Sequence, residues 1–377
     1  MIKFQNVSVE IKGKRILNNI NLTVNDGEFV LLCGESGCGK TTLTRLVNGM
    51  IPHFIKDVKV DGTVTVNDLD IAESPMYKIA ESVGSVFQNP KTQFFNTDSS
   101  AEIAFGLENI GADRDYMHKR VAQTISDLKI ENLADRNVFS MSGGEKQLLA
   151  FASIYAMNPQ IYVLDEPSAN LDHEAIEKLR KILETVKKSG HTVLIAEHRI
   201  SYLYGLADRI VYLKDGCIEK DFTAAAFAGI TESERIAMGL RSICSEEIDI
   251  PERVIMQPDS SLAVQHLSVK RKKQAVIHDF SLSANVGDII GIVGKNGSGK
   301  STLCSSLCGL LPTVNGEVIY RGRKLSRRAR NRQFGVVMQD VNHQLFSDSV
   351  KNECLSANPD ATNQEIEELL NSFDLLD

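Results

Sequence analysis

Two short stretches of this 377-residue chain have residue types and spacing suited to holding phosphate. Residues 34–41 (Gly-Glu-Ser-Gly-Cys-Gly-Lys-Thr) and 294–301 (Gly-Lys-Asn-Gly-Ser-Gly-Lys-Ser) both fit G-x-x-x-x-G-K-[ST]. The glycines let backbone N–H groups converge on phosphate oxygens, and the following helix adds the positive end of its dipole. The motif predicts that Lys40 and Lys300 reach the β- and γ-phosphates of a nucleotide. It also predicts that Thr41 and Ser301 bind Mg²⁺.

Each loop lies where a strand should give way to a helix. The apolar runs 29–33 and 289–293 precede the two loops, and a helix-like stretch follows each one. This is the context that the phosphate-binding motif requires. Because two matches occur in the same context, we favour phosphate sites over two glycine turns without a ligand.

The duplication extends beyond the loops, which lie 260 positions apart. Similar stretches occur at the same offset upstream (16–22 with 276–282, 25–28 with 285–288) and at an offset of 251 downstream (83–88 with 334–339). The change in offset indicates an insertion in the first copy around residues 53–60. We interpret the chain as a tandem repeat of a whole domain, because the period is too long for a solenoid.

Composition and charge narrow the classes of function. The net charge of −7 argues against general affinity for nucleic acid. One basic run, residues 321–332, is interpreted as a solvated helix face, with contact to anionic lipid or an acidic partner as the alternative. Seven cysteines without paired metal spacing indicate reduced thiols in a cytosolic protein. No signal peptide or membrane-spanning run is evident, so another chain would supply any membrane crossing.

Three further motifs in the first copy suit nucleotide chemistry. Ser142-Gly143-Gly144-Glu145 opens a long helix pattern, which predicts a second anion-binding helix end. The apolar run 161–164 ends in Asp165, suited to Mg²⁺, and Glu166, suited to polarising a water molecule. A third apolar run, 192–196, leads through Glu197 to His198, which should emerge at the same carboxyl edge of a parallel sheet.

The order of these motifs resembles the ATP-binding cassette (ABC) ATPases. The matching positions are 34–41, the glutamine loop at Gln88, the signature 142–145, Asp165-Glu166, the loop 168–172 and the switch histidine His198. The resemblance covers residues from about 1 to 220. It implies an α/β fold with a mixed-sheet core, an antiparallel β subdomain and an α-helical subdomain in each of two tandem P-loop domains.

The resemblance also implies roles for residues and a need for ATP and Mg²⁺. ATP would lie between the phosphate loop of one domain and the signature of another. Glu166 would position the attacking water, His198 would contact the γ-phosphate and the metal, and Gln88 would link the site to a partner subunit. The implied metal ligands are Thr41, Gln88, Asp165 and Ser301. The implied nucleotide-binding residues are Gly34, Ser36, Gly37, Cys38, Gly39, Lys40, Thr41, Thr42, Ser142, Gly143, Gly144, Gly294, Asn296, Gly297, Ser298, Gly299, Lys300, Ser301, Thr302 and Gln339.

Two departures from the family pattern stand out. Ile11 and Arg271 occupy the place, 23 residues before each loop, where the family often has an aromatic residue that stacks on adenine. Adenine stacking is therefore not expected, although the Arg271 guanidinium could substitute. The signature reads Met-Ser-Gly-Gly-Glu in place of the commoner Leu-Ser-Gly-Gly-Gln.

A narrower resemblance follows each glutamine. Residues 88–95 and 339–346 share the form Q-x-x-x-x-Q-[FL]-F, which is similar to the ATPase subunits of energy-coupling-factor importers for vitamins and metal ions. This implies a peripheral protein on the cytoplasmic face of the membrane. A transmembrane partner would bind in a helical-subdomain groove near Gln93, Phe94 and Phe95. The alternative interpretation of the two phenylalanines is core of the helical subdomain.

The second copy stops about ten residues before a signature would begin. We therefore expect a complete ABC domain at 1–220, a helical appendage and linker at 221–260, and the N-terminal part of a second domain at 261–377. We expect a fragment of a longer protein or a disrupted reading frame; the alternative is pairing of first domains from two chains. The alternative function is a soluble tandem ABC ATPase acting on ribosomes or nucleic acid. A P-loop kinase would leave Ser142-Gly143-Gly144 and His198 unexplained.

Overall fold

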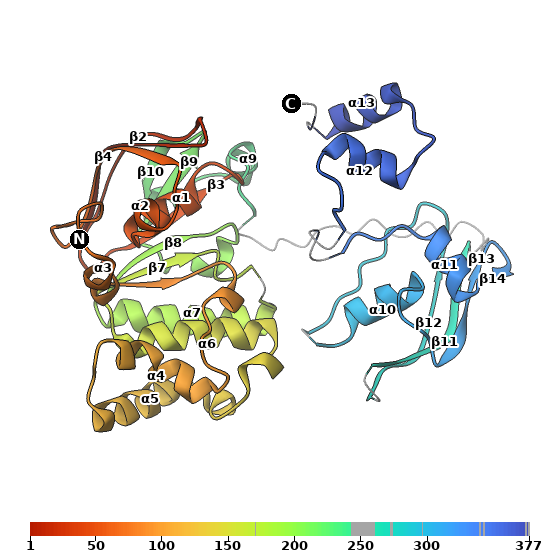
Figure 1. The fold of residues 1–377 in the computed structure, drawn as a ribbon, viewed down its shortest axis with the longest axis horizontal. Helices are drawn as coiled ribbons and strands as arrows, with labels where there is room; N and C mark the ends of the chain where they lie inside the picture. The colour runs from red at the N-terminus through yellow and green to blue at the C-terminus, as the bar shows by residue number, and fades with distance from the viewer. Residues whose placement is uncertain are drawn as a thin grey trace. The chain divides into compact units, whose positions relative to one another are not determined.

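The computed structural model describes residues 1–169, 171–242, 261–271, 274–295, 297–338, 341, 344–373 and 375. The chain divides into two compact units, Met1–Glu252 and Arg253–Asp377 (Figure 1). Among the described residues, no helix is both long and apolar enough to cross a lipid bilayer. The cysteines in the same part of the chain are free thiols.

The first unit is built on two β-sheets. An antiparallel sheet has the strand order β2-β1-β4-β5, from β1 (Ile2–Ile11), β2 (Lys14–Val24), β4 (Val58–Val66) and β5 (Leu69–Asp70). A six-stranded sheet has the order β10-β9-β3-β8-β7-β6, from β3 (Phe29–Gly34), β6 (Val83–Val86), β7 (Ile161–Asp165), β8 (Thr192–Ala196), β9 (Arg209–Lys214) and β10 (Cys217–Thr223). The second sheet is parallel except at its β10 edge, so it is the mixed sheet that the resemblance to the ABC ATPases implies.

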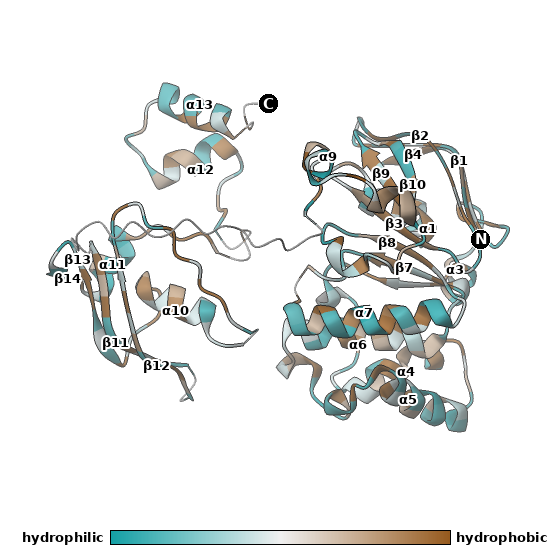
Figure 2. Cartoon of the chain, turned by 180° about the vertical axis from the view of Figure 1, so that it is seen from behind, coloured by the Kyte–Doolittle hydropathy of each residue, from teal (hydrophilic) through white to brown (hydrophobic). Residues whose placement is uncertain are grey.

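Helices flank the mixed sheet and form a separate helical region. They are α1 (Lys40–Val47), α2 (Met50–His53), α3 (Met76–Ser82), α4 (Ser99–Asn109), α5 (Arg114–Leu128), α6 (Gly143–Met157), α7 (His173–Lys188), α8 (Ala224–Ala228) and α9 (Glu232–Ala237). Short 3-10 turns are η1 (Pro90–Thr92), η2 (Glu131–Leu133), η3 (Val138–Ser140) and η4 (Ser201–Leu203). Helices α6 and α7 run along one face of the sheet, and α4 and α5 lie beyond α6 (Figures 1 and 2).

Strand β3 carries side chains into two hydrophobic cores. Phe29 and Leu31 join the core that also contains apolar residues of α4, α6 and α7. Val30 and Leu32 join the core shared with α1 and the antiparallel sheet. Alternate residues of a strand point to opposite faces, so burial on both faces requires a continuous apolar run. This explains why residues 29–33 contain no polar residue.

Helix α7 shows how the residue pattern determines where a helix begins and which of its faces packs on the sheet. Its buried residues Leu179, Ile182, Leu183 and Val186 follow the spacing of a single helix face. At its N-terminus the Asp172 side chain accepts the backbone N–H of Ala175, which satisfies one of the free donors of the first turn. The apolar face therefore packs on the sheet while the charged face remains in solvent.

The segment after β10 packs onto the first unit. Phe227 of α8 and Met238 and Leu240 after α9 are buried in the core on the α6 and α7 side. The Tyr212 hydroxyl on β9 donates to the Met238 carbonyl at 3.0 Å. The expected helical appendage is thus part of the first compact unit, while residues 243–260 lie outside the described residues.

The second unit repeats the antiparallel sheet. Its strand order is β12-β11-β13-β14, from β11 (Leu262–Arg271), β12 (Gln274–Ala284), β13 (Asn315–Tyr320) and β14 (Arg323–Lys324). Its helices are α10 (Lys300–Leu307), α11 (Arg327–Gln333), α12 (Val350–Ala357) and α13 (Asn363–Ser372). Leu262 pairs with Ala284 just as Ile2 pairs with Val24, so the strand register recurs at the offset of 260 seen in the sequence.

The prediction of a strand at residues 289–293 was wrong. No regular strand forms there, and Ile289 and Val293 are 100% and 92% exposed. In the first unit, β3 has the same pattern but is paired with β8 and β9. The described residues of the second unit contain no strand that pairs with this run, so it has neither ladder hydrogen bonds nor a covered face.

The basic run of the second unit is partly structural. The Arg327 guanidinium donates to the carbonyls of Gly309 and Leu310, and Arg330 donates to that of Ser306 at 2.7 Å. These carbonyls follow or end helix α10, where cations are favourable. The neighbouring Arg328 is exposed. The interpretation as a purely solvated face therefore holds for only part of the run.

Candidate nucleotide site

The first phosphate loop joins β3 to α1, and only glycine fits at its first position. Gly34 has φ of 143°, and a Cβ there would lie 2.2 Å from the Leu213 carbonyl oxygen. The Lys40 side chain folds back across the loop, where Nζ donates to the carbonyls of Gly34 at 2.9 Å and Glu35 at 2.8 Å. Lys40 is only 4% exposed. The loop thus holds a positive charge at its centre, where an anion would sit.

The hydroxyl after Lys40 meets the carboxylate at the end of β7. Thr41 Oγ1 donates to Asp165 Oδ1 at 3.0 Å. Burial raises the pKa of the Asp165 carboxyl above its usual range, and the hydrogen bond from Thr41 opposes that rise. A hydroxyl and a carboxylate in contact are hard oxygen donors of the kind that bind Mg²⁺ through few protein ligands and substrate phosphates. The predicted pair therefore fits a magnesium ion.

Glu166 lies at the centre of a second group of contacts. Its Oε1 is 3.2 Å from His198 Nε2, and its Oε2 accepts a hydrogen bond from Gln88 Nε2 at 2.9 Å. The His198 hydrogen bond is the main cause of a Glu166 pKa below the usual range, which keeps the carboxylate ionised. The Glu166 N–H donates to the Ala196 carbonyl, and its φ of 45° turns the chain out of the strand. Three segments that are distant in sequence therefore converge at one carboxylate.

The phosphate loop, Glu166 and His198 line a cavity of about 600 Å³, a size suited to a nucleotide. Its lining residues are Ile11, Lys12, Lys14, Ile16, Ser36, Gly37, Gly39, Lys40, Thr41, Thr42, Glu166 and His198. Lys12, Lys14 and Ile16 were not among the residues predicted from the sequence. They come from the hairpin between β1 and β2, whose turn residues Lys12 and Gly13 both have positive φ.

The signature residues do not line this cavity. Ser142 caps α6 by accepting the N–H of Glu145 at 3.3 Å, and the Glu145 carboxylate accepts the N–H of Ser142, which forms a capping box. Ser142 and Gly143 are exposed. The structure therefore brings together the loop, the strand-end carboxylates, Gln88 and His198, but leaves the signature facing solvent within the first unit.

The second phosphate loop reproduces the lysine geometry of the first. Lys300 Nζ donates to the carbonyls of Gly294 at 2.7 Å and Lys295 at 2.9 Å. Gly297 and Gly299 have positive φ, Ser301 is exposed, and Thr302 is buried. The predicted site residues Asn296 and Gln339 lie outside the described residues. The loop therefore keeps its local fold although the run before it is not a strand.

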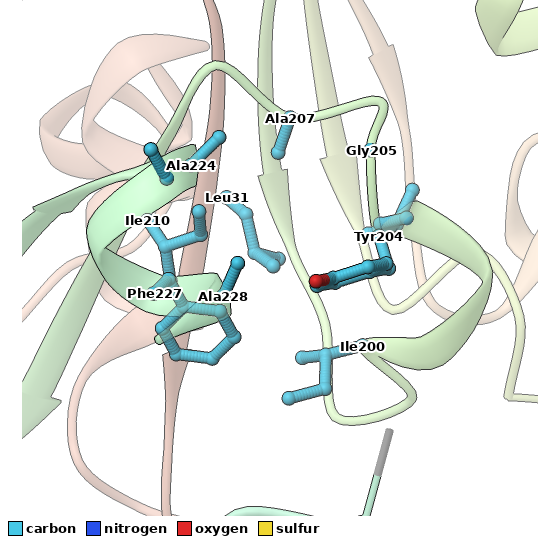
Figure 3. A pocket seen from close by; sticks show the side chains of 11 residues that line it. Leu31, Ile200, Tyr204, Gly205, Ala207, Ile210, Ala224, Phe227 and Ala228 are labelled. Carbon is cyan, nitrogen blue, oxygen red and sulfur yellow. The ribbon is translucent and has the colours of Figure 1, made fainter. Parts of the chain in front are cut away.

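A second cavity in the first unit is unsuited to a nucleotide. It has a volume of about 230 Å³ and lies among α8, η4 and the sheet (Figure 3). Its lining residues are Leu31, Ile200, Leu203, Tyr204, Gly205, Ala207, Ile210, Ala224, Ala225, Phe227 and Ala228. None of these side chains is a cation, so the cavity offers nothing to bind a triphosphate.

The glutamine after Gln88 anchors the start of the helical region. Gln93 Oε1 accepts the N–H of Phe87 at 3.0 Å, and its Nε2 donates to the Ser85 carbonyl at 2.9 Å. The buried Glu102 carboxylate on α4 accepts the N–H of Phe95 at 3.1 Å. The second glutamine of the motif thus shapes the turn and does not itself present a free binding group.

The two phenylalanines of the motif have different environments. Phe94 packs against the core on the α6 side, which agrees with the alternative core interpretation for this residue. Phe95 is 74% exposed and stacks on Phe105 of α4, with ring centroids 4.8 Å apart. Phe105 is half-buried, so the stack presents one exposed ring on a partly buried one, and an exposed aromatic ring of this kind is typical of a protein-binding surface.

The second unit repeats this turn. Gln344 accepts the N–H of Met338 at 2.6 Å and donates to the Val336 carbonyl at 2.7 Å. Glu353 accepts the N–H of Phe346 at 3.0 Å, and Phe346 is 87% exposed. These hydrogen bonds match those of Gln93 and Glu102 in the first unit one for one.

Sequence comparisons agree with this geometry. A family model described as ABC transporter matches residues 17–169 and 277–377. A Treponema denticola protein provisionally named ABC transporter ATP-binding protein is 43% identical over 385 residues, covering 100% of this chain and 78% of that protein. A Methanosarcina mazei protein with the same provisional name is 28% identical over 404 residues, covering 94% of this chain and 68% of that protein.

Solved structures agree as well. The structure of cbiO1 from Clostridium perfringens, part of the ABC transporter complex cbiONQ, matches with a TM-score of 0.55 and 29% identity, over 63% of this chain and 92% of that chain. The dimeric, post-hydrolysis ATP-binding cassette MJ0796 bound to ADP and Pi matches with a TM-score of 0.52 and 26% identity, over 59% and 99% of the two chains. With the convergence of loop, carboxylates and histidine described above, these matches assign the chain to the ABC transporter family, whose ATP-binding proteins hydrolyse ATP.

Proposed function

We propose that this chain is the ATP-binding and ATP-hydrolysing subunit of a membrane importer of the energy-coupling-factor type. The observation that carries the ATPase part is the ionised Glu166 carboxylate, held by His198 and Gln88 at the edge of the cavity that contains Lys40. On this proposal Lys40 binds the β- and γ-phosphates. Mg²⁺, bound by Thr41 with Asp165 nearby, would neutralise charge on the phosphates.

The proposed roles at Glu166 follow from its two neighbours. Glu166 orients the attacking water through its carboxylate, which its lowered pKa keeps in the ionised form that a proton acceptor requires. His198 holds the carboxylate and faces the place of the γ-phosphate. Gln88, on the segment that leads to the helical region, reports the state of Glu166 to the surface around Phe95. The exposed signature residues would close the site of another molecule or domain, and the dimeric form of MJ0796 supports this arrangement.

We expect the aliphatic side chain of Ile11 to limit the affinity of the site for ATP, because it offers no ring for the adenine base to stack on. Ile11 lines the cavity in the place where the family often has an aromatic ring. Replacing Ile11 with Tyr should raise the affinity for ATP about 3- to 10-fold, because stacking on an aromatic face contributes about 0.5–1.5 kcal/mol. Titration calorimetry with Mg·ATP would measure the change. Affinity for inorganic tripolyphosphate should not change, since it has no base.

The matched control for this substitution is Ile236→Tyr, which adds the same ring on α9 where Ile236 is 65% exposed. Equal affinities of the Ile11→Tyr variant and the unmodified chain for ATP would mean that the base does not lie against Ile11.

The importer part rests on the Q-x-x-x-x-Q-[FL]-F turn, the exposed Phe95 ring stacked on Phe105 and the likeness to cbiO1. The proposed partner is a transmembrane subunit that buries Phe95. Replacing Phe95 with Ala should reduce recovery of that subunit from detergent-solubilised membranes at least about tenfold, since a central aromatic contact contributes about 2 kcal/mol or more. ATP binding should be unaffected.

Tyr77→Ala on α3 removes an aromatic side chain of similar exposure and serves as the control. Recovery of ribosomes or nucleic acid with the unmodified chain, and of no integral membrane protein, would favour the alternative function. Recovery of a membrane subunit that is equal for the Phe95→Ala and unmodified chains would reject the proposed surface.

A further inference from the structure

Glu197, the residue before His198, carries a buried carboxylate that has no part in the proposed chemistry. Glu197 is only 2% exposed. Its backbone N–H donates to the Leu32 carbonyl at 3.1 Å, close to the start of the first phosphate loop. An ionisable side chain at such a place is rarely retained for packing alone, because burying a charge is costly unless its hydrogen bonds are satisfied.

Within the part of the chain that the structure describes, the hydrogen-bond donors to this carboxylate come from two functional segments and the turn after them. Oε1 accepts the N–H groups of His198 at 2.7 Å and Arg199 at 3.0 Å. Oε2 accepts the Tyr202 hydroxyl at 2.9 Å and the N–H of Ser168 at 3.3 Å. Ser168 lies two residues after Glu166. One side chain therefore joins the loop that follows Glu166 to the backbone of the histidine that holds Glu166.

A second contact fixes the same loop. The Arg199 guanidinium donates to the Leu171 carbonyl at 3.2 Å. Burial and the neighbouring Glu197 carboxylate raise the pKa of Tyr202 well above its ordinary value, so its hydroxyl remains a donor. The residues on both sides of His198 thus hold the loop after Glu166 at two points.

We propose that Glu197 is a positioning residue for ATP hydrolysis: it links the loop after Glu166 to His198, so that the two groups that meet at the γ-phosphate keep one relative orientation. The proposal rests on the proposed function, since it assigns Glu197 an effect only through His198 and Glu166. A misplacement of about 1 Å at reacting groups can cost about 100-fold in rate, so the link has a measurable consequence.

Glu197→Gln is the sharpest test because it keeps the shape of the side chain. Both carboxylate oxygens accept two donors, so either orientation of the amide places an NH₂ group against two N–H or O–H groups. We expect kcat for ATP hydrolysis by the full chain to fall about 10- to 100-fold, with the KM for ATP unchanged. The exposed Glu81→Gln on α3 is the matched control and should behave as the unmodified chain.

A double-mutant cycle separates positioning from general destabilisation. In a His198→Ala background, Glu197→Gln should cause little further loss of kcat, because its effect passes through His198. Independent, multiplicative losses would overturn the proposal, as would an unchanged kcat in Glu197→Gln. If Glu197→Gln does not fold, Tyr202→Phe decides: a several-fold lower kcat at constant KM supports the link, and an unchanged kcat rejects it. Absence of hydrolysis by the unmodified chain would instead count against the proposed function.

Discussion

Replacing Glu166 with Gln is expected to lower kcat for ATP hydrolysis by about 10²–10⁴-fold while ATP stays bound. The amide cannot accept a proton from the attacking water, although it can still contact His198 and Gln88. Glu166 lies beside the phosphate loop, and Lys40 Nζ donates hydrogen bonds to the carbonyls of Gly34 and Glu35. The substitution should therefore leave the contacts between Lys40 and the nucleotide phosphates in place. Hydrolysis would be measured as the release of inorganic phosphate, and ATP binding by calorimetric titration with Mg·ATP.

The same variant should also lengthen the life of the ATP-bound state. The signature residues Ser142 and Gly143 are exposed and do not line the cavity of their own unit. Closing the nucleotide site around ATP therefore requires the signature of another domain or another molecule. Light scattering of the Glu166→Gln chain should therefore show a larger species with Mg·ATP than without it. The exposed Glu73→Gln is a suitable control. Turnover of the Glu166→Gln chain at the rate of the unmodified chain would remove Glu166 from its proposed role.

Replacing Lys40 with Ala is expected to weaken Mg·ATP binding at the first loop about 10- to 150-fold. Nζ is held at the loop centre by two carbonyls, and the loss of one charge-assisted hydrogen bond to a phosphate costs about 1.5–3 kcal/mol. The measurement is best made by calorimetry in a Lys300→Ala background, so that the second loop contributes little to the signal.

The control for this substitution is Lys78→Ala, which removes an exposed lysine of α3. Thermal unfolding of each variant would show whether the fold is kept. If Lys40→Ala bound Mg·ATP with the affinity of the unmodified chain in that background, the first loop would not be the phosphate site.

The sequence was most informative where elements are buried on both sides. The apolar runs 161–164 and 192–196 lie within β7 and β8 of the structure, and their ends meet at one edge as parallel strands require. This is why Asp165, Glu166 and His198 could be predicted to come together.

The same local pattern was misleading where tertiary partners decide the outcome. Residues 289–293 have the same apolar pattern as β3, but a buried strand needs at least one neighbouring strand to pair with and elements that cover its faces. The described second unit provides no strand that pairs with this run. Periodicity describes which side chains a segment could bury, and it carries no information on whether a partner is present.

Long-range contacts account for the other differences. Lys12 and Lys14 line the cavity because the β1–β2 hairpin lies beside the phosphate loop, a placement that depends on the whole antiparallel sheet. The bond from Gln88 to Glu166 joins residues 78 positions apart. Glu197 belongs to none of the motifs found in the sequence. Its proposed role follows from the four N–H and O–H groups that donate hydrogen bonds to its carboxylate, which come from three segments of the chain.

The most direct test of the central claim is a crystal structure of the Glu166→Gln chain grown with Mg·ATP. The claim is that residues from Lys40 to His198 surround one triphosphate and its magnesium ion. We predict the β- and γ-phosphates at Lys40 Nζ, the metal bound to Thr41 Oγ1 with Asp165 adjacent, and His198 facing the γ-phosphate. A nucleotide bound elsewhere in the first unit, with Lys40 still donating to Gly34 and Glu35, would contradict the account.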